Sequence, residues 1–252
     1  MSGDTLARPR LGTAAGVPYV ALPPTAADAE PDGSPPLIVA WHGTHRPPRT
    51  YSAFAAALPL TGVPAWRVYP GLPEAPDDAS AVEQAAAQAP AVVMELRREL
   101  GLETSPLGLA GFSLGGTVAV RTLARGELPV AAVALIAPLR YGELPAADIA
   151  ARAPALLFVA GGADDTVPPS ELAAMRDQLR TAGVADVELA TFRMGHALAA
   201  EPGTEARPQI AEAISVDAAI TDWFRDHLGV RPRGLSDPAP ARGALAQDSA
   251  RT

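Results

Sequence analysis

Residues 106–116 have the sequence PLGLAGFSLGG, in which an apolar run is followed at once by the pattern G-x-S-x-G. Residues 107–110 are typical of a buried strand, and residues 117–125 favour a helix. A strand, a sharp turn and a helix form the setting in which G-x-S-x-G makes a nucleophile elbow. We therefore expect a strained turn that lifts Ser113 clear of a sheet.

The two glycines of the pattern, Gly111 and Gly115, are expected where a side chain would collide with a neighbouring strand or helix. The start of the following helix points backbone N–H groups at any negative charge that forms beside Ser113. The alternative is a chance occurrence of the pattern in a glycine-rich loop.

Composition restricts the chemistry that this chain can perform. The 252 residues suit a single α/β domain with a large core. The absence of cysteine excludes disulfides, Cys-ligated zinc and a cysteine nucleophile. All 20 basic residues are arginine, which excludes Schiff-base chemistry on lysine. The net charge of −8 argues against nucleic-acid binding.

The beginning of the chain has no apolar run, so we expect no signal peptide. No stretch approaches the roughly 18 uninterrupted apolar residues that a membrane span requires. We therefore expect a soluble, cytoplasmic enzyme.

Apolar runs alternate with helical patterns along the chain, which predicts a doubly wound, mostly parallel sheet flanked by helices. We expect residues 1–14 to form a flexible arm, 15–228 a single domain, and the Pro- and Arg-rich residues 229–252 a disordered tail. The expected strands are 17–22, 36–43, 65–70, 107–110, 130–138, 155–160 and 187–192. The expected helices are 51–58, 80–100, 117–125, 146–152, 170–182 and 207–228.

The ends of these elements carry further expectations. Residues 17–22 are predicted to form an edge strand, and residues 187–192 to lie near a sheet edge. Asp78 or Ser80 is a candidate cap for the helix 80–100, and Ser170 for the helix 170–182.

Three chemical groups follow three predicted strands, in the order Ser113, then Asp164 or Asp165, then His196. Ligands of such sheets sit at the carboxyl ends of the strands. A serine hydroxyl is a weak nucleophile and needs a base, which His196 can supply near neutral pH. A carboxylate behind the imidazole fixes its tautomer and stabilises the imidazolium. The order serine, acid, histidine is that of α/β hydrolases.

With these motifs, the chain resembles α/β hydrolases of the carboxylesterase, lysophospholipase and acyl-protein thioesterase group over about residues 15–228. The motifs are WHGT at 41–44, GFSLGG at 111–116, GGADDTVP at 161–168 and GH at 195–196. The resemblance implies an α/β-hydrolase fold, no cofactor, and Asp164 as the acid because it lies four residues before a proline.

An oxyanion hole needs two preorganised N–H donors. One is expected to be the backbone N–H of Leu114, the residue after the nucleophile. The resemblance places the second at Thr44, after the strand that ends in His42-Gly43, and makes the role of His42 structural. The alternative to Asp164 as the acid is Asp165. The alternative to a structural role of His42 is a metal site formed by His42 and His45.

The connection from 139 to 154 is only about fifteen residues long, whereas the group often carries a lid or cap at this point. We therefore expect a minimal cap and an open site that buries little of a long acyl chain. Arg46 and Arg49, in a loop at the expected mouth, are candidates to contact an acidic group of the substrate.

The expected reaction is hydrolysis of a small-molecule ester or thioester through an acyl-enzyme. The same residues would also serve acyl transfer, cyclisation or lactone hydrolysis. A third hypothesis is a hydrolase-fold protein that binds a ligand without catalysis. The oligomeric state stays open.

Overall fold

The computed structural model describes residues 9–24, 34–43, 50–196 and 211–229. In these residues eight strands form one sheet with the order β1-β2-β4-β3-β5-β6-β7-β8. The strands are β1 (Arg10–Ala14), β2 (Val17–Leu22), β3 (Leu37–Trp41), β4 (Trp66–Pro70), β5 (Leu107–Phe112), β6 (Val130–Ile136), β7 (Ala155–Gly161) and β8 (Val187–Phe192).

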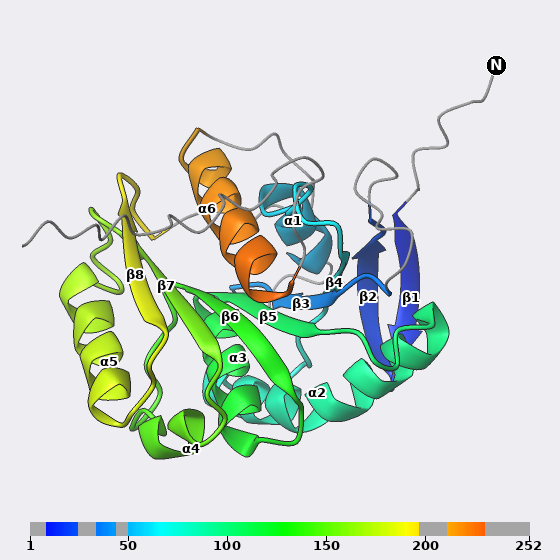
Figure 1. Cartoon of the computed structure of the whole chain (residues 1–252), viewed down its shortest axis with the longest axis horizontal. Coiled ribbons are helices and arrows are strands. Elements are labelled where there is room, and N and C mark those ends of the chain that lie inside the picture. Colours follow the sequence, from blue (N-terminus) through cyan, green and yellow to red (C-terminus); the bar gives the residue numbers. More distant parts are fainter. Residues whose placement is uncertain (1–8, 25–33, 44–49, 197–210, 230–252) are drawn as a thin grey trace, which may run out of the picture.

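The sheet is covered by helices on both faces (Figure 1). One face carries α1 (Thr50–Ala57) and α6 (Ala211–His227). The other carries α2 (Asp78–Leu100), α3 (Leu114–Arg125), α4 (Ala146–Ala150) and α5 (Pro169–Thr181). The hydrophobic residues accordingly form two clusters, one on each face. This arrangement confirms the predicted doubly wound α/β fold.

The central strands pair in parallel from β4 through β3, β5, β6 and β7 to β8. Every residue of β3 and of β7 is buried, as expected for strands that are covered on both faces. Strand β8 lies at one edge of the sheet, as predicted. Because these strands are parallel, the carboxyl ends of β5, β7 and β8 lie at the same end of the sheet. The candidate residues follow the strands at that end.

The N-terminal part of the sheet differs from our prediction. Residues 10–14 were assigned to a flexible arm, but they form β1, which pairs antiparallel with β2 and takes the edge position expected for β2. Ala15 and Gly16 have φ values of 48° and 80°, so they form the two-residue turn that joins the strands. The folded domain therefore includes β1, while residues 1–8 and 230–252 lie outside the described residues.

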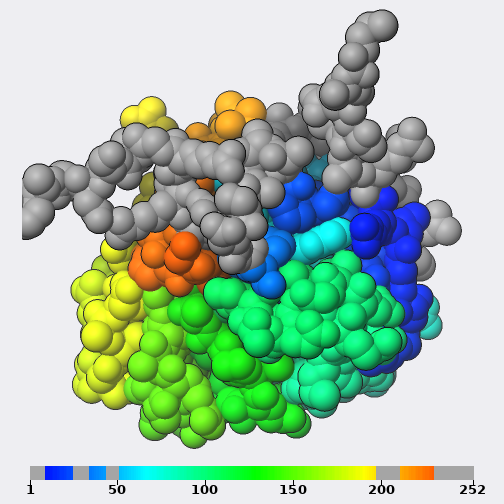
Figure 2. Space-filling view, turned by 45° about the vertical axis from the view of Figure 1, so that its right-hand side comes forward, coloured from blue at the N-terminus to red at the C-terminus, as the bar shows by residue number. Residues whose placement is uncertain are grey.

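The hairpin β1–β2 is attached to α2 (Figure 2). The backbone N–H of Ala15 donates to Glu95 Oε2 at 2.6 Å, and the Tyr19 hydroxyl donates to Glu99 Oε2 at 3.1 Å. Both carboxylates belong to the last two turns of α2. This contact links segments that are 80 residues apart in sequence.

Two predicted helix caps were wrong by a few residues. Helix α2 is capped by Asp77, whose carboxylate accepts from the Ser80 N–H at 2.7 Å. Helix α5 begins at Pro169 without a side-chain cap, so Ser170 lies inside its first turn. Proline suits this position because its fixed φ matches the helix and its missing N–H needs no partner.

None of the helices in the described ranges is long and apolar enough to cross a membrane.

A partly buried polar cluster ties α6 to the segment before β4. The Asp217 carboxylate accepts from the Leu60 N–H at 2.8 Å, and the Arg67 guanidinium donates to the Leu60 carbonyl at 3.0 Å. Arg67 also donates to the carbonyl of Pro23. Burial raises the pKa of Asp217, and the N–H of Leu60 and the charge of Arg67 lower it by less.

This raised pKa predicts a pH dependence of stability. A carboxyl with a raised native pKa binds its proton more tightly in the folded state, so its contribution to the unfolding free energy grows as pH falls. We expect Asp217→Asn to exceed wild type in unfolding free energy by the largest amount at neutral pH. This difference in unfolding free energy should shrink towards about pH 4. Urea unfolding across this range checks it, with Asp222→Asn, an exposed carboxylate of the same helix, as control. A constant difference between Asp217→Asn and wild type would contradict the prediction.

Candidate active site

Ser113 is the single residue between the end of β5 and the start of α3. Its backbone has φ 52° and ψ −115°, a conformation that costs a residue with a side chain about 1–3 kcal/mol. The Ser113 N–H donates to the carbonyl of Ile136 at 2.8 Å, and its carbonyl accepts from the Leu139 N–H at 3.2 Å. Neighbouring backbone thus holds the strained residue on both sides.

The glycines of the elbow allow the chain to approach itself closely. A Cβ on Gly111 would lie within 3.0 Å of the carbonyl oxygen of Gly115. A Cβ on Gly115 would lie within 3.0 Å of the carbonyl oxygen of Trp41, at the end of β3. The expected steric role of both glycines is confirmed, because backbone atoms occupy the space that a side chain would need.

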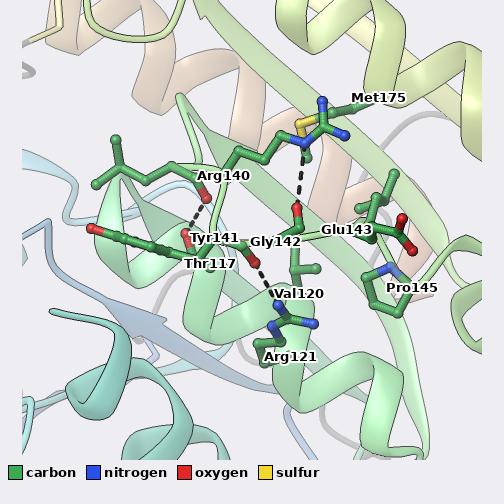
Figure 3. Close-up of a pocket in the computed structure, with 11 residues that line it drawn as sticks. Thr117, Val120, Arg121, Arg140, Tyr141, Gly142, Glu143, Pro145 and Met175 are labelled. Atoms are coloured by element: carbon green, nitrogen blue, oxygen red, sulfur yellow. Dashed lines mark hydrogen bonds between the residues drawn. The ribbon is translucent and has the colours of Figure 1, made fainter.

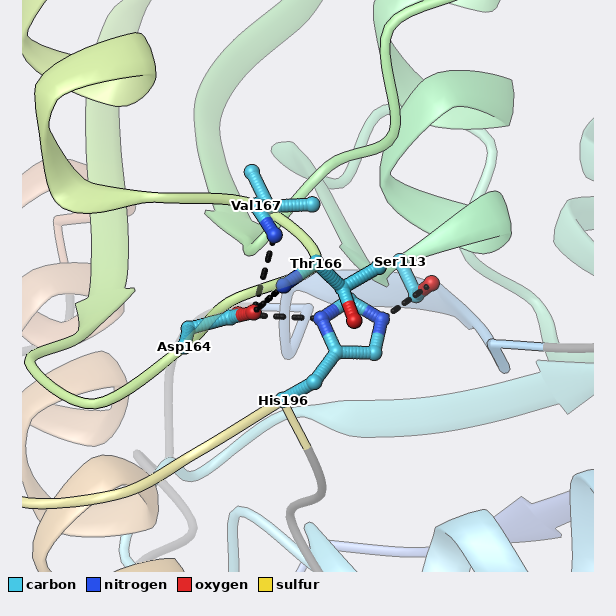
Figure 4. Close-up of polar contacts among 5 residues, drawn as sticks. All are labelled: Ser113, Asp164, Thr166, Val167 and His196. Carbon is cyan, nitrogen blue, oxygen red and sulfur yellow. Dashed lines mark hydrogen bonds and ion pairs between the residues drawn. The ribbon is translucent and has the colours of Figure 1, made fainter.

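Ser113, His196 and Asp164 form a continuous chain of hydrogen bonds (Figure 4). Ser113 Oγ lies 2.9 Å from His196 Nε2, and His196 Nδ1 lies 2.9 Å from Asp164 Oδ2. A carboxylate can only accept, so the Nδ1 nitrogen carries a proton and Nε2 of the neutral ring is left to accept from the serine hydroxyl. This is the arrangement in which an imidazole can act as a base towards serine.

The structure brings Asp164, and not Asp165, to the histidine. The Asp164 side chain is fully buried, and its Oδ1 accepts from the backbone N–H groups of Thr166 at 2.9 Å and Val167 at 2.8 Å. These two N–H donors stabilise the carboxylate and leave Oδ2 for the imidazole. Asp165 is exposed to solvent.

Contacts between the ends of β7 and β8 position the base against the acid. The N–H of Gly162 donates to the carbonyl of Phe192 at 2.7 Å, and the N–H of Ala163 donates to that of Met194 at 3.0 Å. The His196 side chain remains 25% exposed, so a reacting group can approach it. The acid is therefore rigid and buried, whereas the base is accessible.

An aromatic side chain that the sequence analysis did not single out lies beside the base. The ring of Phe112 is 5.3 Å from the ring of His196 and stacks on that of Phe54 at 6.5 Å. Phe112 is the residue between the first glycine and the serine of the G-x-S-x-G pattern. This position directly before the nucleophile is the sequence signal that could have predicted its place beside the base.

The expected oxyanion donors are only partly described. Leu114 is the first residue of α3, so its N–H has no intrahelical acceptor. Thr44 lies outside the described residues, as do His45, Arg46 and Arg49. His42 is buried, and its Nε2 accepts from the N–H of Leu72 at 3.3 Å. In the part of the chain that the structure describes, no group of three or more His, Asp or Glu residues is arranged to hold a metal ion.

Solved structures of similar fold include several esterases. TT1662 from Thermus thermophilus is 21% identical, with 86% of this chain and 98% of that chain covered and a TM-score of 0.64. A thermophilic esterase from the Planctomycetes species Thermogutta terrifontis is 18% identical, with coverages of 92% and 96% and a TM-score of 0.64. An esterase of the fungus Rhizomucor miehei is 16% identical, with coverages of 88% and 83% and a TM-score of 0.63. At these identities the likeness shows a shared fold.

A search of the curated proteins found no match. Residues 75–228 match the dienelactone hydrolase family, and this range includes all three residues of the hydrogen-bonded chain. The expected resemblance to carboxylesterase-like α/β hydrolases is confirmed. Because the match spans more than half of the sequence, the chain belongs to the dienelactone hydrolase family of the α/β-hydrolase superfamily.

Proposed function

We propose that this protein hydrolyses a small-molecule carboxylic ester through an acyl-enzyme on Ser113. The observation that carries the proposal is the chain of two 2.9 Å contacts from Ser113 through His196 to Asp164. Membership of a family of ester-cleaving α/β hydrolases supports the same reaction class.

In the proposed mechanism, His196 Nε2 takes the hydroxyl proton as Ser113 Oγ attacks the acyl carbonyl. The negative charge on the carbonyl oxygen is stabilised by the Leu114 N–H, with Thr44 proposed as the second donor. His196 then returns the proton to the leaving oxygen, and the C–O bond breaks to leave an acyl-enzyme. A water molecule, deprotonated by His196, releases the acid and restores Ser113. Asp164 holds the imidazole in the required tautomer throughout.

The proposed substrates are esters with a short acyl group. The connection between β6 and β7 contains the five-residue helix α4, which is too short to form a separate lid over Ser113. One structure of the Thermogutta terrifontis esterase is described as propionate-bound, which supports a short acyl group here by likeness of fold. Thioesters would be cleaved by the same steps with sulfur as the leaving atom.

Lactone hydrolysis is the second candidate function, and the family to which the chain belongs favours it. A lactone is an ester whose leaving alcohol stays attached to the acyl group. The side chain of the base is partly exposed, so a ring can approach it from solvent. The product would then be a single hydroxy acid.

Removal of the nucleophile is the direct test of the proposed mechanism. We expect Ser113→Ala to lose at least about a thousandfold in kcat/KM, because nothing replaces the attacking oxygen. It should also fail to react with a fluorophosphonate probe. Ester hydrolysis assays and labelling check both, and a thermal melt shows whether the variant is folded. Substantial turnover by folded Ser113→Ala would exclude Ser113 as the nucleophile.

The two adjacent aspartates allow a matched test of the acid. We expect Asp164→Asn to lower kcat by about a thousandfold or more, because an amide favours the wrong imidazole tautomer. Asp165→Asn makes the same replacement of a carboxylate by an amide, but at an exposed side chain, and should leave kcat nearly unchanged. Steady-state kinetics on both variants decide the assignment, and the reverse result would assign the acid to Asp165.

A substrate series tests the expected size of the acyl group. For p-nitrophenyl esters from acetate to decanoate, we expect kcat/KM to be highest at the short end, because the acyl chain finds little surface to bury itself against. Saturated five- and six-membered lactones belong in the same series. An increase of kcat/KM up to decanoate would contradict the short-acyl proposal and indicate a long apolar channel.

A further inference from the structure

The peptide unit that joins Ser113 to Leu114 contains both the carbonyl of the nucleophile and the proposed oxyanion donor. A trans peptide is planar, and its C=O and N–H point in opposite directions. Any group that fixes the Ser113 carbonyl therefore also fixes the direction of the Leu114 N–H. The contacts made by this carbonyl decide how well the donor is preorganised.

The Ser113 carbonyl is held from two sides. Within α3 it accepts from the Thr117 N–H at 3.2 Å, as the first carbonyl of a helix does. The Thr117 hydroxyl also lies 3.4 Å from this carbonyl, which is a longer contact than the one it makes with the Leu139 carbonyl. From outside the helix it accepts from the Leu139 N–H, also at 3.2 Å. A donor at a carbonyl polarises the whole amide, so the Leu139 bond also strengthens the Leu114 N–H as a donor.

Leu139 belongs to residues 137–142, which follow β6 and which we call the strap. Thr117, 4% exposed, donates from its hydroxyl to the Leu139 carbonyl at 2.5 Å, and Arg121 Nη2 donates to the Tyr141 carbonyl at 2.5 Å (Figure 3). Thr117 thus holds Leu139 by its carbonyl, while the N–H of the same residue reaches Ser113.

The strap borders a pocket between α3 and α5, whose wall includes Thr117, Leu139 and Met175 (Figure 3). The side chains of Leu139 and Tyr141 pack against the core but are only partly buried, so hydrogen bonds also contribute to fixing the strap. The strap also begins at Ala137, whose φ of 42° is unfavourable for a residue with a Cβ. The position of the strap therefore depends on the hydrogen bonds that Thr117 and Arg121 donate to it.

We propose that Thr117 is a positioning residue for the hydrolytic reaction, acting on the Ser113–Leu114 peptide mainly through Leu139, to which its hydroxyl makes the shorter bond. This inference rests on the proposed function. Among the described residues, Thr117 contacts the Ser113 carbonyl but neither Ser113 Oγ nor His196. Its hydroxyl fixes the strap, the strap fixes and polarises the peptide, and the peptide presents the Leu114 N–H to the oxyanion.

The position of Thr117 in this sequence of contacts predicts a kinetic signature. The oxyanion exists only in the transition state and the tetrahedral intermediate, so a weakened donor lowers kcat and leaves KM unchanged. Removing an oxyanion donor outright costs about a hundredfold to a thousandfold. Loosening it through Leu139 should cost less, about tenfold in kcat.

The experiment compares Thr117→Val with Thr122→Val. Thr122 is also buried in α3, but its hydroxyl has no hydrogen-bond partner among the described residues. Both substitutions replace a buried hydroxyl by a methyl group of similar size. Thr117→Ser, which keeps the hydroxyl, is the rescue variant, and Thr117→Ala replaces Thr117→Val if the latter does not fold.

Two measurements are made on each full-length variant. The first is kcat and KM on an ester that the wild type hydrolyses. The second is the inhibition constant of a trifluoromethyl ketone, which forms a tetrahedral adduct with an oxyanion. We expect Thr117→Val to lose about tenfold in kcat and in inhibitor affinity with KM unchanged. Thr117→Ser and Thr122→Val should match the wild type.

The outcomes separate this inference from the proposed function. An active wild type with Thr117→Val and Thr122→Val alike in kcat and inhibitor affinity would overturn the role of Thr117 alone. A rise in KM without loss of kcat would also overturn it, since ground-state binding would then be affected. A folded wild type that neither hydrolyses esters nor reacts with a fluorophosphonate would overturn the proposed function, and this inference with it.

Discussion

The backbone of Ser113 is the constraint on which the other features depend. A residue with a side chain is held at φ 52° between a strand and a helix, a conformation that survives only where its surroundings impose it. Strand β6 and the strap impose it through Ile136 and Leu139, which bond the N–H and the carbonyl of Ser113. Glycines at positions 111 and 115 let the two sides of the elbow, and the end of β3, approach one another closely.

Burial separates the roles of the acid and the base. Asp164 is enclosed and accepts three hydrogen bonds, so its carboxylate has one orientation. His196 is partly open and follows the edge strand β8, where a substrate can reach it. Because the strands are parallel, both residues lie at the same end of the strands as Ser113, the carboxyl end. The stabilising contacts of Arg67 lie at the other end of the parallel strands, near the start of β4.

The region after β6 links the fold to the chemistry. In place of a long cap, the chain has a short strap that is bonded to α3 and reaches the nucleophile peptide through Leu139. The Leu139 N–H of this strap lies within hydrogen-bonding distance of the Ser113 carbonyl. Substrate size and oxyanion geometry are therefore proposed to depend on one segment.

The alternation of apolar runs and helices and the elbow around Ser113 were predictable, because each is a local pattern. The order of serine, acid and histidine was predictable because each of these residues follows a predicted strand. Asp164 could be preferred over Asp165 only by resemblance. In the structure, burial and two backbone N–H donors select it.

Strand β1 was missed, because Leu11 is exposed at a sheet edge and such a strand has no buried run. The bond from Thr117 to Leu139 joins residues 22 apart, and no local pattern encodes it. Such contacts arise only when the packed sheet brings distant backbone together.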